Sequence, residues 1–324
     1  MIEMKAIQRI LLQEIDLSDD TFSVSYLPDL QRLRSSSEQM GLIQPVLLRK
    51  KKDHYQIVCG FRRISVMKAL EKSEIESKVF DEKEGDEFHL FSLSLHENLT
   101  TRGFNAVEKA IALDKLIHLF RIDPAVAIKT FLPFFSLEPN EKILNTYLSL
   151  AQMEDEIKTY ILKEEVSRSN IRKLSTLTPD NRMAVLSLIS PLKLGENHLR
   201  ETLTLLEEIS RRNQCEGRDV VQRPEIQAIL SQRELTPSQK TERVKKVLTD
   251  LRYPRLNRLE KAFDMKRKGL NLPSNILLHH PPFFEGKRLK IEFQFETVEE
   301  YRGILSALSV LPGKEGFKQM VETD

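Results

Sequence analysis

Residues 57–70, IVCGFRRISVMKAL, constrain this chain most, because they predict a strand, one glycine and then a helix. Arg62 and Arg63 fall in the first turn of that helix. The peptide dipole is already positive there, so each cation costs a few tenths of a kcal/mol, up to about 1. Free N–H groups, two guanidiniums and the permissive backbone of Gly60 together predict an anion site, favouring a polyphosphate. Alternatively, both arginines pair with nearby acids such as Glu97.

Composition excludes several classes of protein. The 324 residues suggest two or three domains, and a net charge of +2 excludes a globally basic nucleic-acid coat but allows local basic patches. There is no apolar run of 18 residues, so we expect neither a secretory signal nor a membrane span. Cys59 and Cys215 lie far apart without a CxxC motif, which predicts a reducing compartment, with cytoplasm as the default. The common hydrolase, dinucleotide and P-loop motifs are absent from the sequence.

The periodicity predicts an α+β fold that begins with a mixed α/β domain over residues 1–120. Residues 44–50 and 54–59 alternate as two strands of a hairpin with a basic tip. Residues 86–99 show helical spacing, and a further helix begins after Asn105, with Glu108 as its capping-box partner.

Residues 121–215 predict an all-helical middle domain punctuated by prolines, and residues 216–250 a linker and a helix. Residues 211–225, which span the junction of these two regions, are polar without a clear period and are the best linker candidate. Residues 251–324 predict a small α/β domain.

In this last domain, residues 288–296, RLKIEFQFE, alternate strictly and predict a strand that pairs with residues 275–280. A helix follows at Thr297, with Glu300 as a second capping-box partner. A hairpin and one helix cannot bury the strand's phenylalanines, so we expect a dimerisation module. The alternative is packing on the helical region of the same chain.

Three stretches, GLIQPVLLR (41–49), VCGFRRISVMKAL (58–70) and HENLTTRGFNAVEKAIALDKL (96–116), resemble the N-terminal domain of ParB-type partition proteins in order and spacing. The resemblance covers about residues 5 to 120. It implies a domain that binds CTP with Mg²⁺ and acts as a nucleotide-gated sliding clamp on DNA.

The resemblance also assigns site residues by position. Gln44 and Pro45 would meet the cytosine, and Glu97 and Asn98 would face the metal and the γ-phosphate, as hard oxygen ligands suited to Mg²⁺. Gly60, Arg62 and Arg63 would hold the triphosphate. With their neighbours, the nucleotide-binding set that the resemblance implies is Gln44, Pro45, Gly60, Phe61, Arg62, Arg63, Glu97, Asn98 and Arg102.

The chain departs from the family at three positions. Phe61 replaces the glutamate that follows the motif glycine, and Thr100 and Thr101 replace Gln-Arg, with Arg102 one position later as a substitute. These changes predict at most a slow CTPase and leave the catalytic residues unknown. In the related sulfiredoxins the reactive cysteine follows the glycine. Here Cys59 precedes it, which predicts a buried thiol and disfavours that activity.

Residues 123–177 resemble the helix-turn-helix of the same family, in a degenerate form. Lys142, Asn145 and Thr146 are predicted to face outward from the recognition helix, but Glu138 and Glu141 oppose phosphate approach. The following segment offers further candidates for phosphate contact, which are Arg168, Arg172 and Lys173.

The resulting hypothesis is a ParB-like, cytoplasmic and nucleoid-associated DNA-binding protein that dimerises through residues 251–324. It would act in chromosome or plasmid partition as a CTP-gated clamp or a DNA-bound regulator, with a ParA-type ATPase as a candidate partner. Two alternatives stay open. One is a nucleotide-dependent phosphotransferase or hydrolase of the ParB/sulfiredoxin superfamily that uses Glu97 as base, and the other is a scaffold that has lost nucleotide binding.

Overall fold

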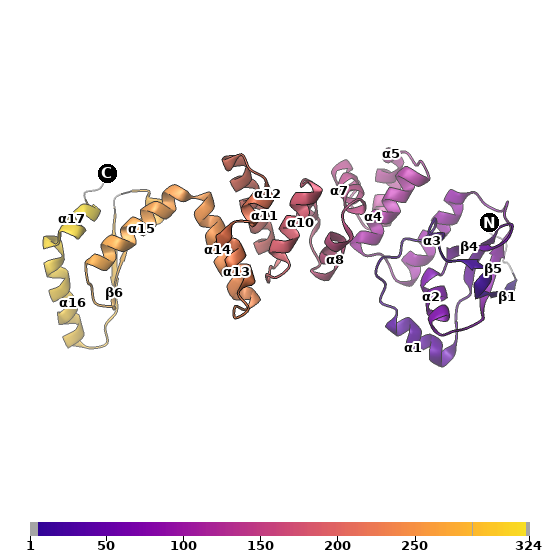
Figure 1. Cartoon of the computed structure of the whole chain (residues 1–324), viewed down its shortest axis with the longest axis horizontal. Coiled ribbons are helices and arrows are strands. Elements are labelled where there is room, and N and C mark those ends of the chain that lie inside the picture. The colour runs from indigo at the N-terminus through magenta and orange to yellow at the C-terminus, as the bar shows by residue number, and fades with distance from the viewer. Residues whose placement is uncertain (1–5, 287, 322–324) are drawn as a thin grey trace. The chain divides into compact units, whose positions relative to one another are not determined.

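A five-stranded mixed sheet lies at the amino-terminal end of the chain in the computed structural model, which describes residues 6–286 and 288–321 (Figure 1). The strand order is β1-β5-β3-β4-β2, with β3 antiparallel to β4 and parallel to β5. The strands are β1 (Ile7–Leu11), β2 (Ile15–Asp16), β3 (Val46–Lys50), β4 (Tyr55–Cys59) and β5 (Glu74–Phe80). The predicted hairpin of residues 44–50 and 54–59 is therefore confirmed as β3 and β4.

The predicted strand–glycine–helix is also confirmed, since α2 (Phe61–Ala69) begins directly after β4 and Gly60. Gly60 has φ +102°, and a Cβ atom there would lie 2.6 Å from Cγ1 of Val46. Both the backbone angle and the lack of space therefore require glycine at this position.

Three further helices belong to this part of the chain, namely α1 (Gln31–Met40), α3 (Glu87–Thr101) and α4 (Ala106–Asp114). Helix α1 packs on α2, and α3 packs on β4. Asn105 and Glu108 form the predicted capping box of α4, which continues as a π-helical turn, η2 (Lys115–Leu119).

Every described element from α4 to α15 is helical, which includes the residues 121–215 that were predicted to be helical. After η2 the order is α5 (Pro124–Val126), η3 (Ala127–Phe131), α6 (Leu132–Phe134), α7 (Glu141–Ala151), α8 (Asp155–Lys163), α9 (Arg168–Ser175), α10 (Pro179–Ile189), α11 (Glu196–Asn213), α12 (Gly217–Val221), α13 (Pro224–Ser231), α14 (Pro237–Arg252) and α15 (Pro254–Gly269). The chain forms two compact units, Met1–Leu186 and Ser187–Asp324. Among the described residues, no helix combines the length and apolar character needed to cross a membrane.

The prediction of a linker at residues 211–225 is wrong. This stretch contains the end of α11, all of α12 and the start of α13. Val220 and Val221 are buried and anchor it to the second unit, although its other residues are mostly polar. The finer domain division at residues 120, 215 and 250 remains a prediction.

The carboxyl-terminal part contains β6 (Ile276–His279), β7 (Lys290–Phe293), α16 (Val298–Val310) and α17 (Glu315–Val321). Strands β6 and β7 pair antiparallel, as predicted, but β7 is shorter than the alternating stretch of residues 288–296. Thr297 caps α16, whereas the Glu300 carboxylate accepts from the N–H of Glu296, so the second capping box is only half formed.

Candidate functional site

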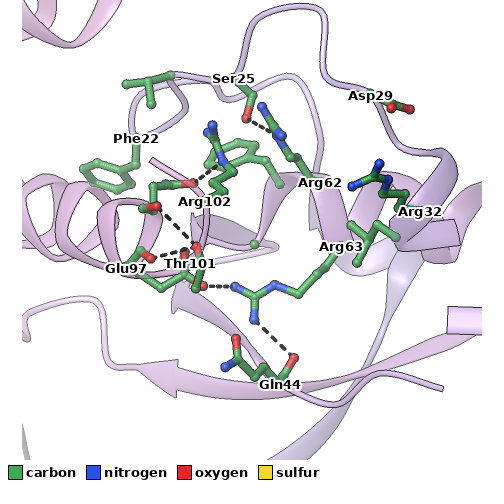
Figure 2. Close-up of a pocket in the computed structure, with 15 residues that line it drawn as sticks. Phe22, Ser25, Asp29, Arg32, Gln44, Arg62, Arg63, Glu97, Thr101 and Arg102 are labelled. Carbon is green, nitrogen blue, oxygen red and sulfur yellow. Dashed lines mark hydrogen bonds and ion pairs between the residues drawn. The ribbon is translucent and has the colours of Figure 1, made fainter. Parts of the chain in front are cut away.

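A cavity of about 600 Å³ opens at the amino end of α2 (Figure 2). All of the residues predicted to bind nucleotide line it except Pro45. Its wall is formed by Phe22, Val24, Ser25, Asp29, Arg32, Leu33, Gln44, Gly60, Phe61, Arg62, Arg63, Glu97, Asn98, Thr101 and Arg102. Three motifs far apart in sequence therefore meet at one place, and residues 22–33 complete the wall.

Arg63 is fixed by acceptors from two directions. Its Nη1 donates to the carbonyl oxygens of Gln44 (3.2 Å) and Pro45 (3.1 Å), and its Nη2 donates to the Glu97 carboxylate (Figure 2). Pro45 thus contributes a carbonyl that holds Arg63 instead of a surface of the cavity. Most of the Arg63 side chain is buried, at 13% exposure, so these contacts fix its position.

Arg62 reaches the other side of the cavity. Its Nη2 donates to Oε1 of Glu108 at 2.7 Å, and its Nε lies 3.4 Å from the Ser25 hydroxyl. Burial, followed by the nearby Arg102 guanidinium, lowers the pKa of Arg62 from its ordinary value. An arginine titrates so far above neutrality that Arg62 still carries its charge.

Glu108 joins both sides of this arrangement from a fully buried position. Its Oε1 accepts from Arg62 and from the N–H of Tyr26 (3.3 Å). Its Oε2 accepts from Arg102 (2.6 Å) and from the N–H of Asn105 (3.2 Å). A buried carboxylate is tolerated only when it is paired and hydrogen-bonded in this way. The capping-box spacing predicted only the contact with Asn105.

Arg102 follows the last residue of α3, and three acceptors hold its side chain. Nε donates to Oδ1 of Asn98 (3.0 Å), and Nη1 donates to the carbonyl of Gly103 (3.0 Å) as well as to Glu108. The guanidinium also lies 5.7 Å from the centre of the Phe104 ring. Its remaining nitrogen, Nη2, is buried and has no hydrogen-bond partner among the residues that the structure describes.

Glu97 and Asn98 do not present a ready Mg²⁺ site. Glu97 is paired with Arg63, and the Asn98 side-chain oxygen accepts from Arg102. In the part of the chain that the structure describes, no group of three histidine, cysteine or acidic residues could hold a metal ion. The residues at the cavity therefore fit a guanidinium-lined anion site better than a metal centre.

The two interpretations of the arginine pair are compatible in this geometry. Arg62 and Arg63 do pair with acids, as the alternative predicted, yet the cavity beside them stays open. Four arginines line the cavity, against the carboxylates of Asp29 and Glu97 at its wall and Glu108 behind it, so four positive minus three negative charges leave one positive. The site retains a positive charge that favours an anion.

Cys59 is fully buried, and burial, followed by the charge of Glu97, raises the pKa of its thiol to about 12. A thiol is nucleophilic only as the thiolate, so Cys59 is chemically inert here. The prediction of a buried core thiol is confirmed.

Of the residues predicted to read DNA, Lys142 and Asn145 are exposed on α7, but Thr146 is buried. The prediction that Thr146 faces outward is wrong, because its hydroxyl donates to the carbonyl of Lys142 at 2.8 Å and turns toward the helix. Six residues, 135–140, separate α6 from α7, which is longer than the usual turn of a helix-turn-helix.

The candidates for phosphate contact lie on α9, where Arg168 and Arg172 are exposed and Lys173 is half-buried. Arg168 lies 3.7 Å from the carboxylate of Glu138, which partly neutralises it. This acid weakens any attraction of α9 to a phosphate backbone.

Comparisons with known proteins find similarity over part of the chain. Residues 2–99 match the family model of the ParB N-terminal domain. The nucleoid occlusion protein of Halalkalibacterium halodurans is 26% identical over 151 residues (47% of this chain, 50% of the relative), and that of Lysinibacillus sphaericus is 27% identical over 146 residues (45% and 46%). The chain thus spans about half the length of these curated relatives.

Two solved structures of C-terminally truncated chromosome-partitioning protein ParB from Caulobacter crescentus also match at 19% identity. The complex with CTP-gamma-S gives a TM-score of 0.27 over 54% of this chain and 94% of that one. The complex with the centromeric parS site gives 0.35 over 61% and 97%. Both TM-scores are below 0.5, so these two structures carry no argument about this chain.

Proposed function

Because residues 2–99 of this chain match the family model of the ParB N-terminal domain, we propose that the chain is a dimeric DNA-binding protein whose cavity at α2 binds CTP. Its role would be partition or nucleoid occlusion, the second being the name of the relatives it matches. CTP would favour closure between two N-terminal domains, which requires that the closed state bind the nucleotide more tightly than the open state. The protein would then be found on the nucleoid, and a ParA-type ATPase remains a candidate partner.

The observation that carries this proposal is the open, arginine-lined cavity at the amino end of α2. A volume of about 600 Å³ lies within the range of small-molecule sites. The first-turn N–H groups of α2 have no partner within the helix, and Arg62 and Arg63 add directed donors for phosphate oxygens. The choice of cytosine rests on the resemblance around Gln44, which lines the cavity.

Phe61 supports binding without efficient turnover. The family glutamate at this position is replaced by an aromatic ring that packs against the sheet core. A phenyl ring can neither accept a proton nor orient water, so the cavity offers one carboxylate fewer for hydrolysis.

For DNA, the proposal assigns α7 and α9 to the contact, through Lys142, Asn145, Arg168, Arg172 and Lys173. The charged flank of Glu138 and Glu141 favours a weak or degenerate reader over a strongly specific one. The slope of binding against salt concentration would count the phosphate contacts.

For the dimer, the support is an apolar surface at the carboxyl end. Phe295, Val298, Tyr301 and Leu305 are 51%, 60%, 37% and 46% exposed. Val298, Tyr301 and Leu305 share one face of α16, and the rings of Phe295 and Tyr301 are 4.9 Å apart. Contiguous apolar surface of this kind marks an interaction site, and we assign it to a second copy of the chain.

A panel of CTP, ATP and GTP affinities on the full chain tests the proposal. Selective CTP binding supports it. ATP turnover with phosphate transfer would favour the phosphotransferase or hydrolase alternative. If no nucleotide binds, the alternative of a scaffold that has lost nucleotide binding would be favoured.

Arg62→Ala should abolish CTP binding without unfolding the chain, because Glu108 keeps Arg102 and two backbone donors. Arg34→Ala is the matched control, since Arg34 pairs with Glu38 on α1 away from the cavity. If Arg62→Ala binds CTP as the wild type does, the site is misassigned.

A further inference from the structure

The two oxygens that the resemblance assigns to Mg²⁺ are both engaged by guanidiniums. Arg63 donates to the carboxylate of Glu97, and Arg102 donates to the side-chain oxygen of Asn98. A metal ion at these oxygens would sit against two fixed positive charges, which repel it. The oxygens of Glu97 and Asn98 are therefore poorly placed to bind a metal ion.

We infer that the Arg102 guanidinium takes the place of the divalent cation, so that the cavity binds a nucleoside triphosphate without requiring a metal ion. This inference rests on the proposed nucleotide function. Arg102 stands one position later than the family arginine, in a segment where Thr100 and Thr101 replace Gln-Arg. The departure places a permanent cation beside the oxygens where an exchangeable one is expected.

Hydrogen bonds fix the Arg102 guanidinium beside the Asn98 oxygen. Asn98, Gly103 and Glu108 accept from it within 3.0 Å, and only 21% of the side chain is exposed. To displace it, a metal ion would have to leave the fully buried Glu108 with a single guanidinium partner, Arg62. Losing one of these two ion pairs costs free energy, although the carboxylate would keep Arg62 and its two backbone donors.

The guanidinium also has a donor to spare. Nη2 of Arg102 is buried without a hydrogen-bond partner, although arginine has five N–H donors and the other two nitrogens are bonded. An unsatisfied buried donor is costly, and an anionic oxygen that reached it after a small side-chain adjustment would satisfy it. A phosphate oxygen is such an acceptor, and guanidinium–phosphate contacts are among the strongest hydrogen bonds in proteins.

Electrostatics give the same result. The cavity and its backing carry one net positive charge before any ligand enters, as counted above from four arginines and three carboxylates. A metal ion in such a site normally bridges and neutralises the terminal phosphates. Here Arg62, Arg63 and Arg102 supply positive charge from the protein itself, in part balanced by Glu97 and Glu108.

The test is the affinity of the full chain for CTP, measured by calorimetry in Mg²⁺ and again in EDTA. We expect the two dissociation constants to agree within about tenfold. A loss of about tenfold or more in EDTA overturns the inference while leaving the proposed nucleotide function intact. No binding under either condition overturns both.

Arg102→Gln sharpens the test, because it removes the cation and frees the Asn98 oxygen. This variant should bind CTP at least about tenfold more weakly in EDTA and should regain affinity when Mg²⁺ is added. A loss that Mg²⁺ does not restore would overturn the substitution of arginine for metal. Arg9→Gln is the control, since Arg9 pairs with Glu74 on an exposed strand pair outside the cavity. Should Arg102→Gln fail to fold, the wild-type comparison decides alone.

Discussion

The cavity at α2 and the apolar surface of α16 differ in what each leaves without a partner. Around the cavity, buried charges are joined in one network, in which Glu108 alone accepts four hydrogen bonds. On α16, Val298, Tyr301 and Leu305 are exposed although they are apolar. We therefore expect the first region to fold without a partner and to gain stability from an anion, and the second to gain stability from another apolar surface.

The contrast predicts different dependence on concentration. A network inside one unit gives a stability that does not change with protein concentration, whereas a surface completed by a second copy gains stability by mass action. Variants in the two regions therefore separate the stability of the fold from the stability of the assembly.

Glu108→Ala should have the largest effect, because it leaves Arg62 and Arg102 facing each other without the buried carboxylate between them. Removing one partner of a buried ion pair costs about 3–5 kcal/mol. Urea unfolding followed by circular dichroism measures this loss. Glu299→Ala, in the first turn of the exposed α16, is the control and should change stability by about 0.5 kcal/mol or less. A similar small change for Glu108→Ala would contradict the role of the network.

A smaller effect is expected on the other side of the comparison. Replacing Phe295 and Tyr301 by Asp should weaken self-association by about tenfold to a hundredfold, because charges then replace anchors of the apolar surface. The monomer should lose little stability, since Phe295 is 51% and Tyr301 37% exposed and neither side chain is buried in the core. Analytical ultracentrifugation measures the association. Val126→Asp, an exposed apolar position on α5, is the control, and an unchanged dimer in the double variant would exclude α16 from the interface.

Sequence reasoning succeeded where structure is local. The alternation in β3 and β4, the positive φ of Gly60 and the Asn105 capping box each depend on a few neighbouring residues. The meeting of three motifs at one cavity was also predictable, but only through the resemblance.

What the sequence did not reveal depends on contacts between distant residues. Nothing around Tyr26 or Glu108 indicates that a backbone N–H and a carboxylate 82 positions apart will meet. Residues 22–33, which complete the cavity wall, have no clear periodicity. The prediction for Thr146 failed because its hydroxyl donates to a carbonyl of its own helix, which lets this polar side chain be buried.

Acid titration gives the smallest expected effect and compares two ion pairs, one in each unit. The hydrogen bonds from Arg182 lower the pKa of Glu154, and the hydrogen bond from Lys290 lowers the pKa of Glu292. A carboxyl group whose pKa is lower in the folded state contributes stability that is full above its ordinary value and is lost as the pH falls through the folded value.

Salt should affect the pKa values of Glu154 and Glu292 differently. Arg182 is buried, and two of its nitrogens donate hydrogen bonds to the Glu154 carboxylate. Lys290 and Glu292, by contrast, lie on the exposed strand β7. In about 1 M salt the Debye length is only about 3 Å, so exposed pairs are screened and buried ones much less. NMR titration should show the pKa of Glu292 returning toward its ordinary value while that of Glu154 stays lowered. If both pKa values return to their ordinary range together, the Glu154 pair is as exposed to solvent as the Glu292 pair. The contrast between the two regions would then not extend to the ion pairs of the two units.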